Sequence, residues 1–232
     1  GHAVPGDLSA PRSGTAADGR LTRLSFSSET GPIAELIVGS AHPTIVSRGS
    51  DWLDPDWPGA VSATREAAGA GVALVLQGAG GNASAAIRDG ETLQGYADRF
   101  AAGAAAVAAT PSAAPGLTLV RIGVTLPETA ASRLVPAFAR GPANNVVCSE
   151  RDTVATVALA RLAGVTLLAV PVEPSFAEGR ALEQAAAADR VVSLAGGYLG
   201  YVEPAEVVAK GEGESRRQYY GADLAQVLEA GA

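Results

Sequence analysis

The stretch Gly71–Gln77 reads GVALVLQ, and it runs directly into the glycine-rich segment Gly78–Ser84, which reads GAGGNAS. A short apolar run of this kind, bounded by glycine, is typical of a buried β-strand. Working outward, a helix is predicted on each side: Pro58–Gly69, with its proline in the first turn, and the alanine-rich Thr92–Thr110, which Pro111 ends. A buried strand between two helices predicts an α/β fold.

The same alternation extends towards both ends of the chain. Leu21–Ser27 and Ile33–Gly39 predict two strands joined by a turn, and thus a hairpin. In the C-terminal half, strands are predicted at Leu117–Leu126, Val165–Val170 and Arg190–Leu194, and helices at Asp152–Leu162, Glu178–Ala188 and Tyr219–Glu229. We therefore expect an α/β fold of mixed β-sheets flanked by helices. Residues 1–20, rich in glycine, proline and serine, predict a flexible lead-in, and residues 21–232 predict a single α/β hydrolase-like domain.

The composition of the 232-residue chain excludes several classes of function. Hydrophobic residues make up 47% of the chain and charged residues 18%, which is enough apolar material for a sizeable core. The formal net charge of −7, with no cluster of basic residues, argues against a nucleic-acid partner. No apolar run approaches the roughly 18 residues that a transmembrane helix requires. Cys148 is the sole cysteine, so neither an intrachain disulfide nor a cysteine-based zinc site is available.

Polar residues stand where several predicted strands end, and these positions are the candidates for chemistry. His42, within Ala41–Thr44, follows the strand Ile33–Gly39. It can act as a metal ligand or a general base, or it can be an ordinary loop residue, which is the commoner role of a lone histidine. Asp56 lies in an acidic turn before a helix, so it either caps that helix or belongs to a loop packed beside a metal.

The glycine-rich segment Gly78–Ser84 offers backbone N–H groups that can hold an anion or an oxyanion. Ser84 would then be a nucleophile; alternatively the segment is a tight turn and Ser84 caps a helix. The segment lacks the Gly-Lys-Ser/Thr ending of a phosphate-binding P-loop. It is not the Gly-x-Ser-x-Gly elbow of serine hydrolases either, because alanines flank Ser84.

A carboxylate and two tyrosines are prominent in the C-terminal half. Glu173 follows the predicted buried strand Val165–Val170, and a carboxylate in such a place requires a partner or a metal. Tyr198 and Tyr201 lie in the glycine-rich segment Gly196–Tyr201. Such tyrosines can be ordinary packing residues, although a phenolate oxygen can also bind zinc.

In their order and spacing, five segments of the chain resemble the neutral/alkaline ceramidase family. They are Ser40–Thr44, Asp54–Gly59, Gln77–Ser84, Val170–Pro174 and Gly197–Val202. Members of this family are zinc-dependent amidases that cleave the N-acyl bond of ceramide. The resemblance covers residues 20–229, and it implies the fold of the ceramidase catalytic domain.

The resemblance also implies a zinc site and a substrate. The implied ligands of one incompletely coordinated zinc ion are His42, Glu173 and Tyr201, and Ser84 falls on the catalytic serine. The implied substrate or oxyanion loop consists of Gly80, Gly81, Asn82 and Asp56. The implied substrate is a small-molecule or lipid N-acyl compound. A secreted or periplasmic location follows from the family, and a cytoplasmic one is left open.

Several parts of the family's pattern are missing here. The family's other zinc histidine lies in a His-x-His stretch well before the His-Pro-Thr motif, whereas the only other histidine of this chain is His2. The family's N-terminal third, which carries a catalytic arginine, and its C-terminal immunoglobulin-like domain have no counterpart. Asn82 replaces an aspartate, and the catalytic tyrosine aligns with Gly213. Three origins are consistent with this: the N-terminal third is a separate chain, it was lost by processing or cloning, or this protein has a reduced site. The expected partner is a second chain that supplies the missing third, or another copy of this chain in a homo-oligomer.

Three functions are consistent with these residues. The first is a zinc-dependent amide hydrolase that cleaves the N-acyl bond of a sphingoid lipid or of another compound. The second is a non-catalytic ceramidase-like binding or partner subunit, which Asn82 and Gly213 favour. The third, independent of the resemblance, is an α/β protein that binds a small anion at Gly78–Ser84.

Overall fold

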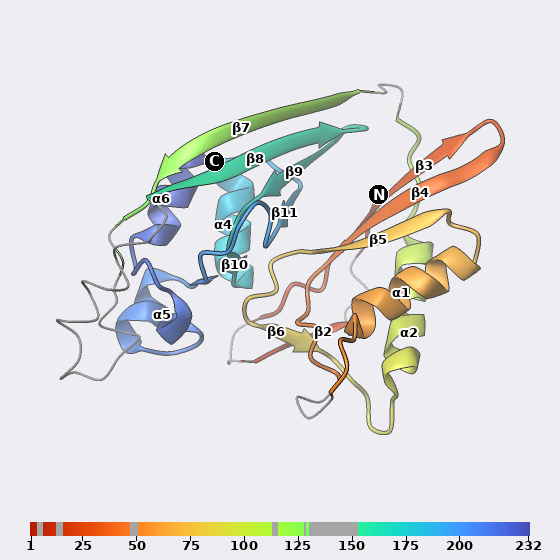
Figure 1. The fold of residues 1–232 in the computed structure, drawn as a ribbon, viewed down its shortest axis with the longest axis horizontal. Coiled ribbons are helices and arrows are strands. Elements are labelled where there is room, and N and C mark those ends of the chain that lie inside the picture. Colours follow the sequence, from red (N-terminus) through yellow and green to blue (C-terminus); the bar gives the residue numbers. More distant parts are fainter. Residues whose placement is uncertain (4–6, 13–15, 47–50, 113–115, 128, 130–152) are drawn as a thin grey trace. The chain divides into compact units, whose positions relative to one another are not determined.

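A computed structural model describes residues 1–3, 7–12, 16–46, 51–112, 116–127, 129 and 153–232. Cys148 and Asp152 lie outside the described residues. Contacts within the chain define two compact units, Gly1–Ala113 and Ala114–Ala232, which we call unit 1 and unit 2 and describe each by itself (Figure 1). The single domain predicted for residues 21–232 stays a prediction.

Unit 1 is built on a four-stranded sheet with the strand order β1-β3-β4-β5. The strands are β1 (His2–Ala3), β3 (Leu21–Ser28), β4 (Gly31–Gly39) and β5 (Val72–Gln77). β3 and β4 pair antiparallel, which confirms the predicted hairpin, whereas β5 runs parallel to β4. In the parallel pair Gly39 lies opposite Gln77, so both strands end at the same edge of the sheet. The His42 segment and the glycine-rich segment therefore leave the sheet side by side.

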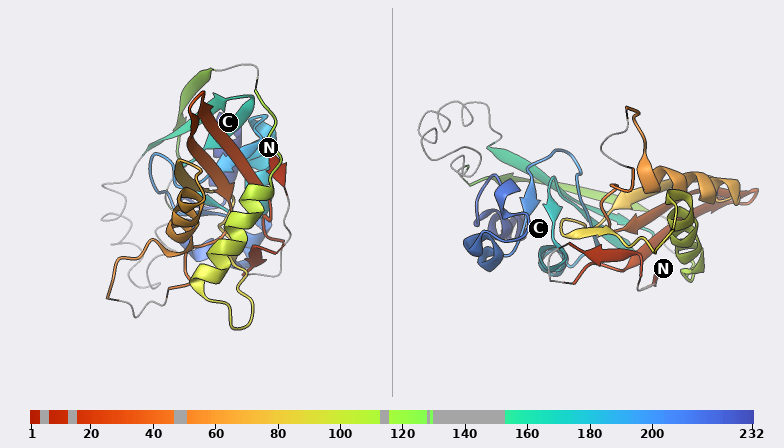
Figure 2. Two further views of the ribbon diagram at one scale, coloured as in Figure 1. Left: turned by 90° about the vertical axis from the view of Figure 1, so that its right-hand side faces the viewer. Right: turned by 90° about the horizontal axis from the view of Figure 1, so that it is seen from below.

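Two helices cover one face of this sheet (Figure 2). α1 (Asp56–Ala67) packs against β5, and α2 (Leu93–Ala106) packs against α1 and β3. Between helices and sheet lie three fully buried aromatic residues, Trp57, Tyr96 and Phe100. The ring centroid of Trp57 lies 4.7 Å from that of Phe100 and 5.8 Å from that of Tyr96. Because large aromatic side chains bury the most apolar area, this cluster is the main anchor of the two helices.

The N-terminal segment, expected as a flexible lead-in, contains two short strands. β1 pairs with β3, and β2 (Ser9–Pro11) pairs antiparallel with β6 (Ala83–Ala85). Leu8 is buried in the unit 1 core, where its carbonyl accepts a hydrogen bond of 2.7 Å from the Tyr96 hydroxyl. These contacts involve partners far along the chain, so the local composition of the segment gives no sign of them.

Unit 2 contains a second four-stranded sheet, with the order β11-β9-β8-β7. The strands are β7 (Leu117–Thr125), β8 (Val154–Leu162), β9 (Val165–Ala169) and β11 (Arg190–Val192). β7, β8 and β9 pair antiparallel in sequence order, and β11 runs parallel to β9.

The helix predicted at Asp152–Leu162 is wrong, because the described part of this segment is the strand β8. Along Val154–Val157 the side chains alternate between exposed and buried, which is the period of a strand. Hydrogen bonding to β7 on one side and β9 on the other outweighs the helix preference of the alanines.

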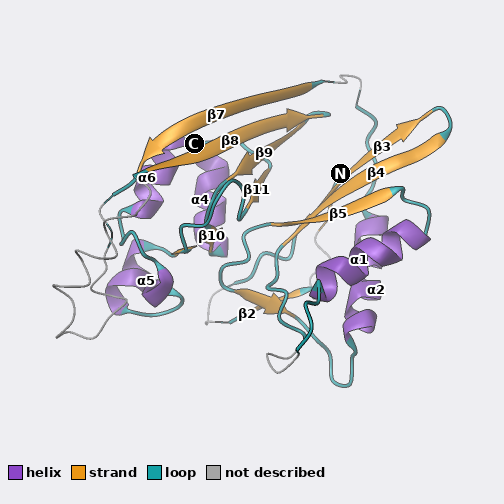
Figure 3. Cartoon of the chain, viewed as in Figure 1, coloured by secondary structure: helices purple, strands orange, loops and turns teal. Residues whose placement is uncertain are grey.

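The rest of unit 2 consists of short elements (Figure 3). They are β10 (Glu173–Pro174), α4 (Phe176–Ala185), β12 (Tyr201–Val202), α5 (Ala205–Lys210), the 3₁₀ turn η3 (Ser215–Arg217) and α6 (Leu224–Gly231). α4 packs on β11, and α6 packs on β7 and α4. Sheets of mixed direction with flanking helices confirm the predicted α/β class. Within the described part of the chain, no helix has the length and apolar character needed to cross a membrane.

Candidate active site

His42 lies just beyond the end of β4 in unit 1, and it is half-buried. Its backbone N–H donates to the Ala83 carbonyl at 3.0 Å, and its ring Nδ1 lies 2.9 Å from the same oxygen. A carbonyl oxygen only accepts hydrogen bonds, so in the neutral ring Nδ1 carries the proton and Nε2 bears the lone pair. Backbone carbonyls commonly orient metal-binding histidines in this way.

Trp57 and Asp56 tie the His42 segment to the core of unit 1. The indole Nε1 of Trp57 donates to the His42 carbonyl at 3.2 Å. Asp56 accepts hydrogen bonds of 2.7 Å from the backbone N–H groups of Val46 and Trp57. Asp56 does not cap α1, since Pro55 occupies the cap position. Asp56 therefore joins the loop after His42 to the start of α1, and its place in a substrate loop stays a prediction.

Ser84 lies beside His42, as the two residues form a parallel β-bridge. It belongs to the short strand β6 and is half-buried. It does not cap a helix, because the next helix, α2, begins at Leu93 and takes Thr92 as its cap. The structure thus brings together two of the predicted site residues at the edge where β4 and β5 end.

The loop before Ser84 is a tight turn built around Gly80. An added Cβ at Gly80 would lie 2.0 Å from the Gln77 Nε2 atom, so a side chain there would displace Gln77. The N–H of Gly80 donates to the Gly78 carbonyl at 2.8 Å, and the N–H of Ala83 donates to the Gly80 carbonyl at 2.9 Å. These two donors are used inside the turn, and an oxyanion would have to be held by other groups.

Gly81 and Asn82 are fixed by the N-terminal segment. The Arg12 side chain donates to the Gly81 carbonyl at 2.7 Å, and the Arg12 backbone N–H donates to the Asn82 carbonyl at 2.8 Å. The buried Asn82 side chain donates through Nδ2 to the Ala16 carbonyl at 3.1 Å. An ionised aspartate would lack this donor, so asparagine suits the position structurally.

Glu173 and Tyr201 are neighbours in unit 2, at paired positions of the parallel strands β10 and β12. The backbone N–H of Glu173 donates to the Gly200 carbonyl at 3.0 Å, and that of Ser175 donates to the Val202 carbonyl at 2.9 Å. Adjacent strands lie about 4.8 Å apart and paired residues project to the same face. Two of the three predicted zinc ligands are therefore adjacent.

Tyr198 and Arg217 contact this pair. The Tyr198 hydroxyl is hydrogen-bonded to Glu173, and burial followed by the charge of Glu173 raises the pKa of Tyr198. The guanidinium carbon of Arg217 lies 5.9 Å from the ring centroid of Tyr201. The carboxylate of Glu214, 3.2 Å from Arg217 Nη1, is the main cause that raises the pKa of Arg217. At neutral pH, Tyr198 is therefore an uncharged donor and Arg217 a cation.

No group of three or more His, Cys, Asp or Glu side chains is placed to hold a metal ion in the described part of the chain. The predicted set contains only two ligands of these types, since its third ligand is Tyr201. Imidazole nitrogen and carboxylate oxygen are ordinary zinc donors. The orientation of His42 by a carbonyl and the pairing of Glu173 with Tyr201 fit such a role, with His42 in unit 1 and the other two residues in unit 2.

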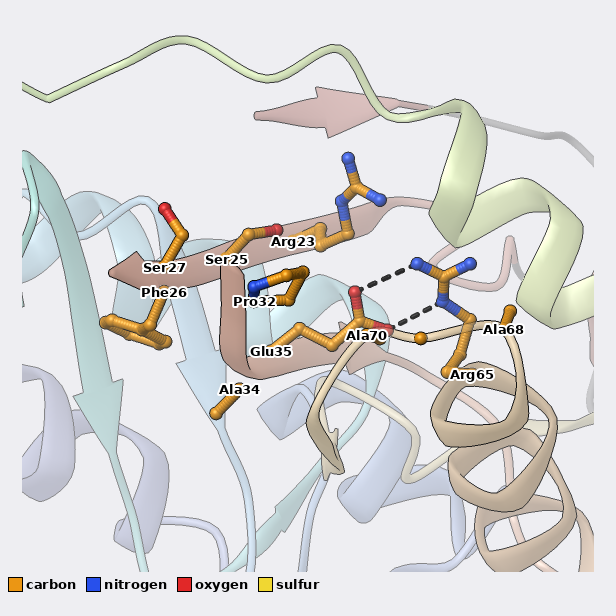
Figure 4. Close-up of a pocket in the computed structure, with 11 residues that line it drawn as sticks. Arg23, Ser25, Phe26, Ser27, Pro32, Ala34, Glu35, Arg65, Ala68 and Ala70 are labelled. Atoms are coloured by element: carbon orange, nitrogen blue, oxygen red, sulfur yellow. Dashed lines mark hydrogen bonds and ion pairs between the residues drawn. The ribbon is translucent and has the colours of Figure 1, made fainter. Parts of the chain in front are cut away.

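A pocket of about 230 Å³ lies elsewhere in unit 1, and no predicted site residue lines it. Figure 4 shows Glu35 and Arg65 pointing toward one another in this pocket, joined by hydrogen bonds of 2.7 and 3.1 Å. These two charges neutralise each other, and Arg23, which also lines the pocket, donates a hydrogen bond of 3.1 Å to the Val107 carbonyl. The pocket gives no support to the anion-binding function considered for Gly78–Ser84.

Two residues of the candidate site were not predicted. Arg12 contacts a loop that is distant in the sequence, and nothing local indicates this contact. Arg217 follows Glu214 by three residues, and this spacing indicates an ion pair within a helical turn. The same spacing does not indicate that the turn faces Tyr201.

No protein-family model and no curated protein sequence matches this chain. The fold places it in the α/β class, with polar residues gathered where strands end. More particularly, its fold is similar to that of about half of the neutral ceramidase chain. A neutral ceramidase from Pseudomonas aeruginosa superposes with a TM-score of 0.76 and 18% sequence identity, over 99% of this chain and 50% of that chain. A ceramidase complexed with C2 gives a TM-score of 0.75 and 18% identity, over 99% of this chain and 51% of that chain. The predicted ceramidase-like fold is confirmed, and the chain spans about half the length of these structures.

Proposed function

We propose that this chain is part of a zinc-dependent amide hydrolase that cleaves an N-acyl bond. The observation that carries the proposal is the pairing of the predicted residues. His42 is bridged to Ser84 in unit 1, and Glu173 is paired with Tyr201 in unit 2. Residues that are distant in the sequence but were assigned to one predicted site thus meet in two pairs, on a ceramidase-like fold.

In this proposal His42, Glu173 and Tyr201 hold the zinc ion, and Ser84 supplies the attacking oxygen. A bound zinc ion would polarise the amide carbonyl. Ser84 Oγ forms a bond to the carbonyl carbon, the C–N bond breaks, and the hydroxyl proton leaves with the amine. Water then attacks the acyl ester on Ser84 and releases the carboxylic acid. The carbonyl of Ala83, which orients His42, belongs to the residue next to Ser84, so one backbone segment positions both groups.

The proposed substrate is a small-molecule or lipid N-acyl compound, of which an N-acyl sphingoid lipid is the first to test. This choice rests on the ceramidase-like fold. A further histidine, to complete the ligand set, would come from outside these 232 residues, and a second chain or a second copy of this chain is the expected source.

The test is to supply zinc to the purified protein and to measure the bound metal together with turnover of a panel of N-acyl substrates. We expect roughly one zinc ion per chain, with loss of that ion in His42→Ala. Ser84→Ala should keep the ion and lose turnover. Ser27→Ala, an exposed serine on β3, is the matched control and should keep both. Protein that takes up no zinc even when it is supplied contradicts the proposal.

A non-catalytic binding or partner subunit is the second candidate, and the surroundings of Gly213 favour it. The family's catalytic tyrosine aligns with this glycine, whose φ is +55°. An added Cβ would lie 2.6 Å from Oε1 of the buried Glu203, which also accepts a hydrogen bond from the Glu214 N–H. Backbone conformation and the buried carboxylate both oppose a side chain here. For this candidate, Ser84→Ala should bind an N-acyl ligand as well as the wild type, and turnover that depends on Ser84 would exclude it.

A further inference from the structure

The backbone fixes the Glu173–Tyr201 pair less completely than it fixes His42. The β10–β12 ladder is two residues long, and its hydrogen bonds determine where the strands lie. They do not determine the rotamers of the carboxylate and the phenol, which depend on contacts made by the side chains themselves.

Arg217 makes such a contact with the buried Tyr201. Its guanidinium carbon lies 5.9 Å from the centroid of the ring. After the charge of Glu214, hydrogen bonding to Tyr201 is the next cause that raises the pKa of Arg217. The turn η3 that carries Arg217 is itself fixed against β12, because Gly200 forms a β-bridge with Gln218. The Gln218 side chain also accepts a hydrogen bond of 2.8 Å from the Glu203 N–H.

Glu214 makes this arrangement compatible with a nearby cation. Its carboxylate lies 3.2 Å from Arg217 Nη1, so it orients the guanidinium and offsets its positive charge. The planar guanidinium of Arg217 thus lies between the carboxylate of Glu214 and the ring of Tyr201, and these two neighbours restrict its orientation.

We propose that Arg217 is a positioning residue, which holds the phenol oxygen of Tyr201 beside Glu173 in the orientation that a metal ligand requires. This inference rests on the zinc site of the proposed function. Residues that hydrogen-bond to metal ligands orient them, and their removal commonly weakens metal binding by about 10–100-fold.

The experiment is zinc titration calorimetry on four proteins: wild type, Arg217→Met, Tyr201→Phe and the double variant. Arg217→Met should weaken zinc binding by about tenfold or more in the wild-type background and should have no further effect in Tyr201→Phe, because Arg217 acts through the phenol oxygen. Arg217→Lys, which retains the charge without the planar fork, should restore part of the affinity. Arg216→Met, an exposed neighbour in the same turn, is the control and should bind zinc normally.

Unchanged zinc affinity in Arg217→Met overturns the proposal. So does tighter binding, which would mean that the guanidinium occupies space that the cation needs. A further arm separates this proposal from the proposed function: the same four proteins are unfolded thermally without metal. If Arg217→Met lowers the melting temperature only when Tyr201 is present, Arg217 holds the tyrosine even in a protein that takes up no zinc. Equal shifts in both backgrounds overturn the positioning role, whatever the wild type binds.

Discussion

The His42–Ser84 pair and the Glu173–Tyr201 pair are both held by backbone bonds, but different parts of the molecule surround them. Around His42 the contacts come from the Ala83 carbonyl and from the fully buried Trp57. In the second pair Tyr201 is itself only 5% exposed, and the contacts include Tyr198, which is 52% exposed, and the Arg217 side chain, which is 51% exposed.

The two pairs therefore differ in how much folding free energy is lost when a contact around them is changed. Contacts made by a buried core cannot be altered without loss of folding free energy, so the position of His42 is as stable as unit 1 itself. Exposed side chains can be exchanged at little cost to the fold. The contacts that Tyr198 and Arg217 make with the second pair can therefore be exchanged while the backbone stays the same.

The largest expected effect is that of Trp57→Ala, which should lower the free energy of unfolding by about 3–5 kcal/mol because it leaves a large cavity in the aromatic cluster. Urea unfolding followed by circular dichroism measures it. Trp52→Ala is the control, because Trp52 is 82% exposed, and it should change stability by less than about 0.5 kcal/mol. A loss below about 1 kcal/mol in Trp57→Ala would show that the core does not fix the His42 segment.

Gly200→Ala should have the next largest effect, and it acts on the other pair. Gly200 has a φ of +90°, and an added Cβ would lie 2.4 Å from the Arg217 carbonyl oxygen. Gly196→Ala is a matched control, since Gly196 has a φ of +80° and its added Cβ would meet nothing within 4 Å. Chemical unfolding should show Gly200→Ala to be less stable than Gly196→Ala by about 1–3 kcal/mol. Equal losses would mean that η3 does not pack closely on β12.

The buried carboxyl of Glu178, in unit 2, should make the stability of the protein depend on pH. It is 8% exposed and its Oε2 has no hydrogen-bond partner within the described part of the chain. Burial, and then the charges of Glu229, Glu206 and Glu203, raise the pKa of Glu178 to about 7. A folded-state pKa above the unfolded value of 4.5 gives a contribution to stability that is complete below pH 4.5 and is lost as pH rises through 7.

Glu178→Gln should remove this dependence. It should match the wild type near pH 4.5 and exceed its unfolding free energy at pH 8 by about 1–2 kcal/mol, a value reduced by solvent screening. Unfolding curves at the two pH values give the comparison. Glu212→Gln, an exposed carboxylate in the same unit, should behave as the wild type at both. A Glu178→Gln protein that is no more stable at pH 8 would contradict a buried carboxyl with a raised pKa.

Arg12→Ala has the smallest expected effect, and it tests the glycine loop. Loss of the hydrogen bond to the Gly81 carbonyl should cost about 0.5–1 kcal/mol, because Arg12 is exposed. Hydrogen exchange should become faster in the loop 78–84 and stay unchanged in α1. Arg121→Ala, an exposed arginine of unit 2, should leave that loop unaffected.

The strands β3, β4 and β5 and both helices of unit 1 were predictable because each has a local signal, whereas the short strands β1, β2 and β6 were not predicted. The apolar run Gly71–Gln77 became β5, and Thr92 became the cap of α2. The β8 strand was mispredicted as a helix because alanine and leucine favour helices locally, and the strand owes its stability to neighbours on both sides.

The candidate site could be predicted as a set of residues, but its pairings could not. His42 and Ser84 were singled out separately, and only the parallel register of β4 and β5 brings their segments to one edge. Glu173 and Tyr201 meet through a ladder of two residues, which is too short to leave a pattern in the sequence. The roles of Arg12 and Arg217 depend on what lies opposite them in space, which no local spacing records.

The two ring nitrogens of His42 have separate roles, so different substitutions can remove one role and keep the other. Nδ1 serves the Ala83 carbonyl, whereas Nε2 is the nitrogen a metal would use. The amide nitrogen of asparagine occupies the position of Nδ1, and that of glutamine occupies the position of Nε2. His42→Asn would therefore retain the architecture of the loop without the nitrogen that is proposed to bind a metal, and His42→Gln would lose the bond to Ala83. A histidine oriented in this way can lose its chemistry in one mutational step while the fold around it persists.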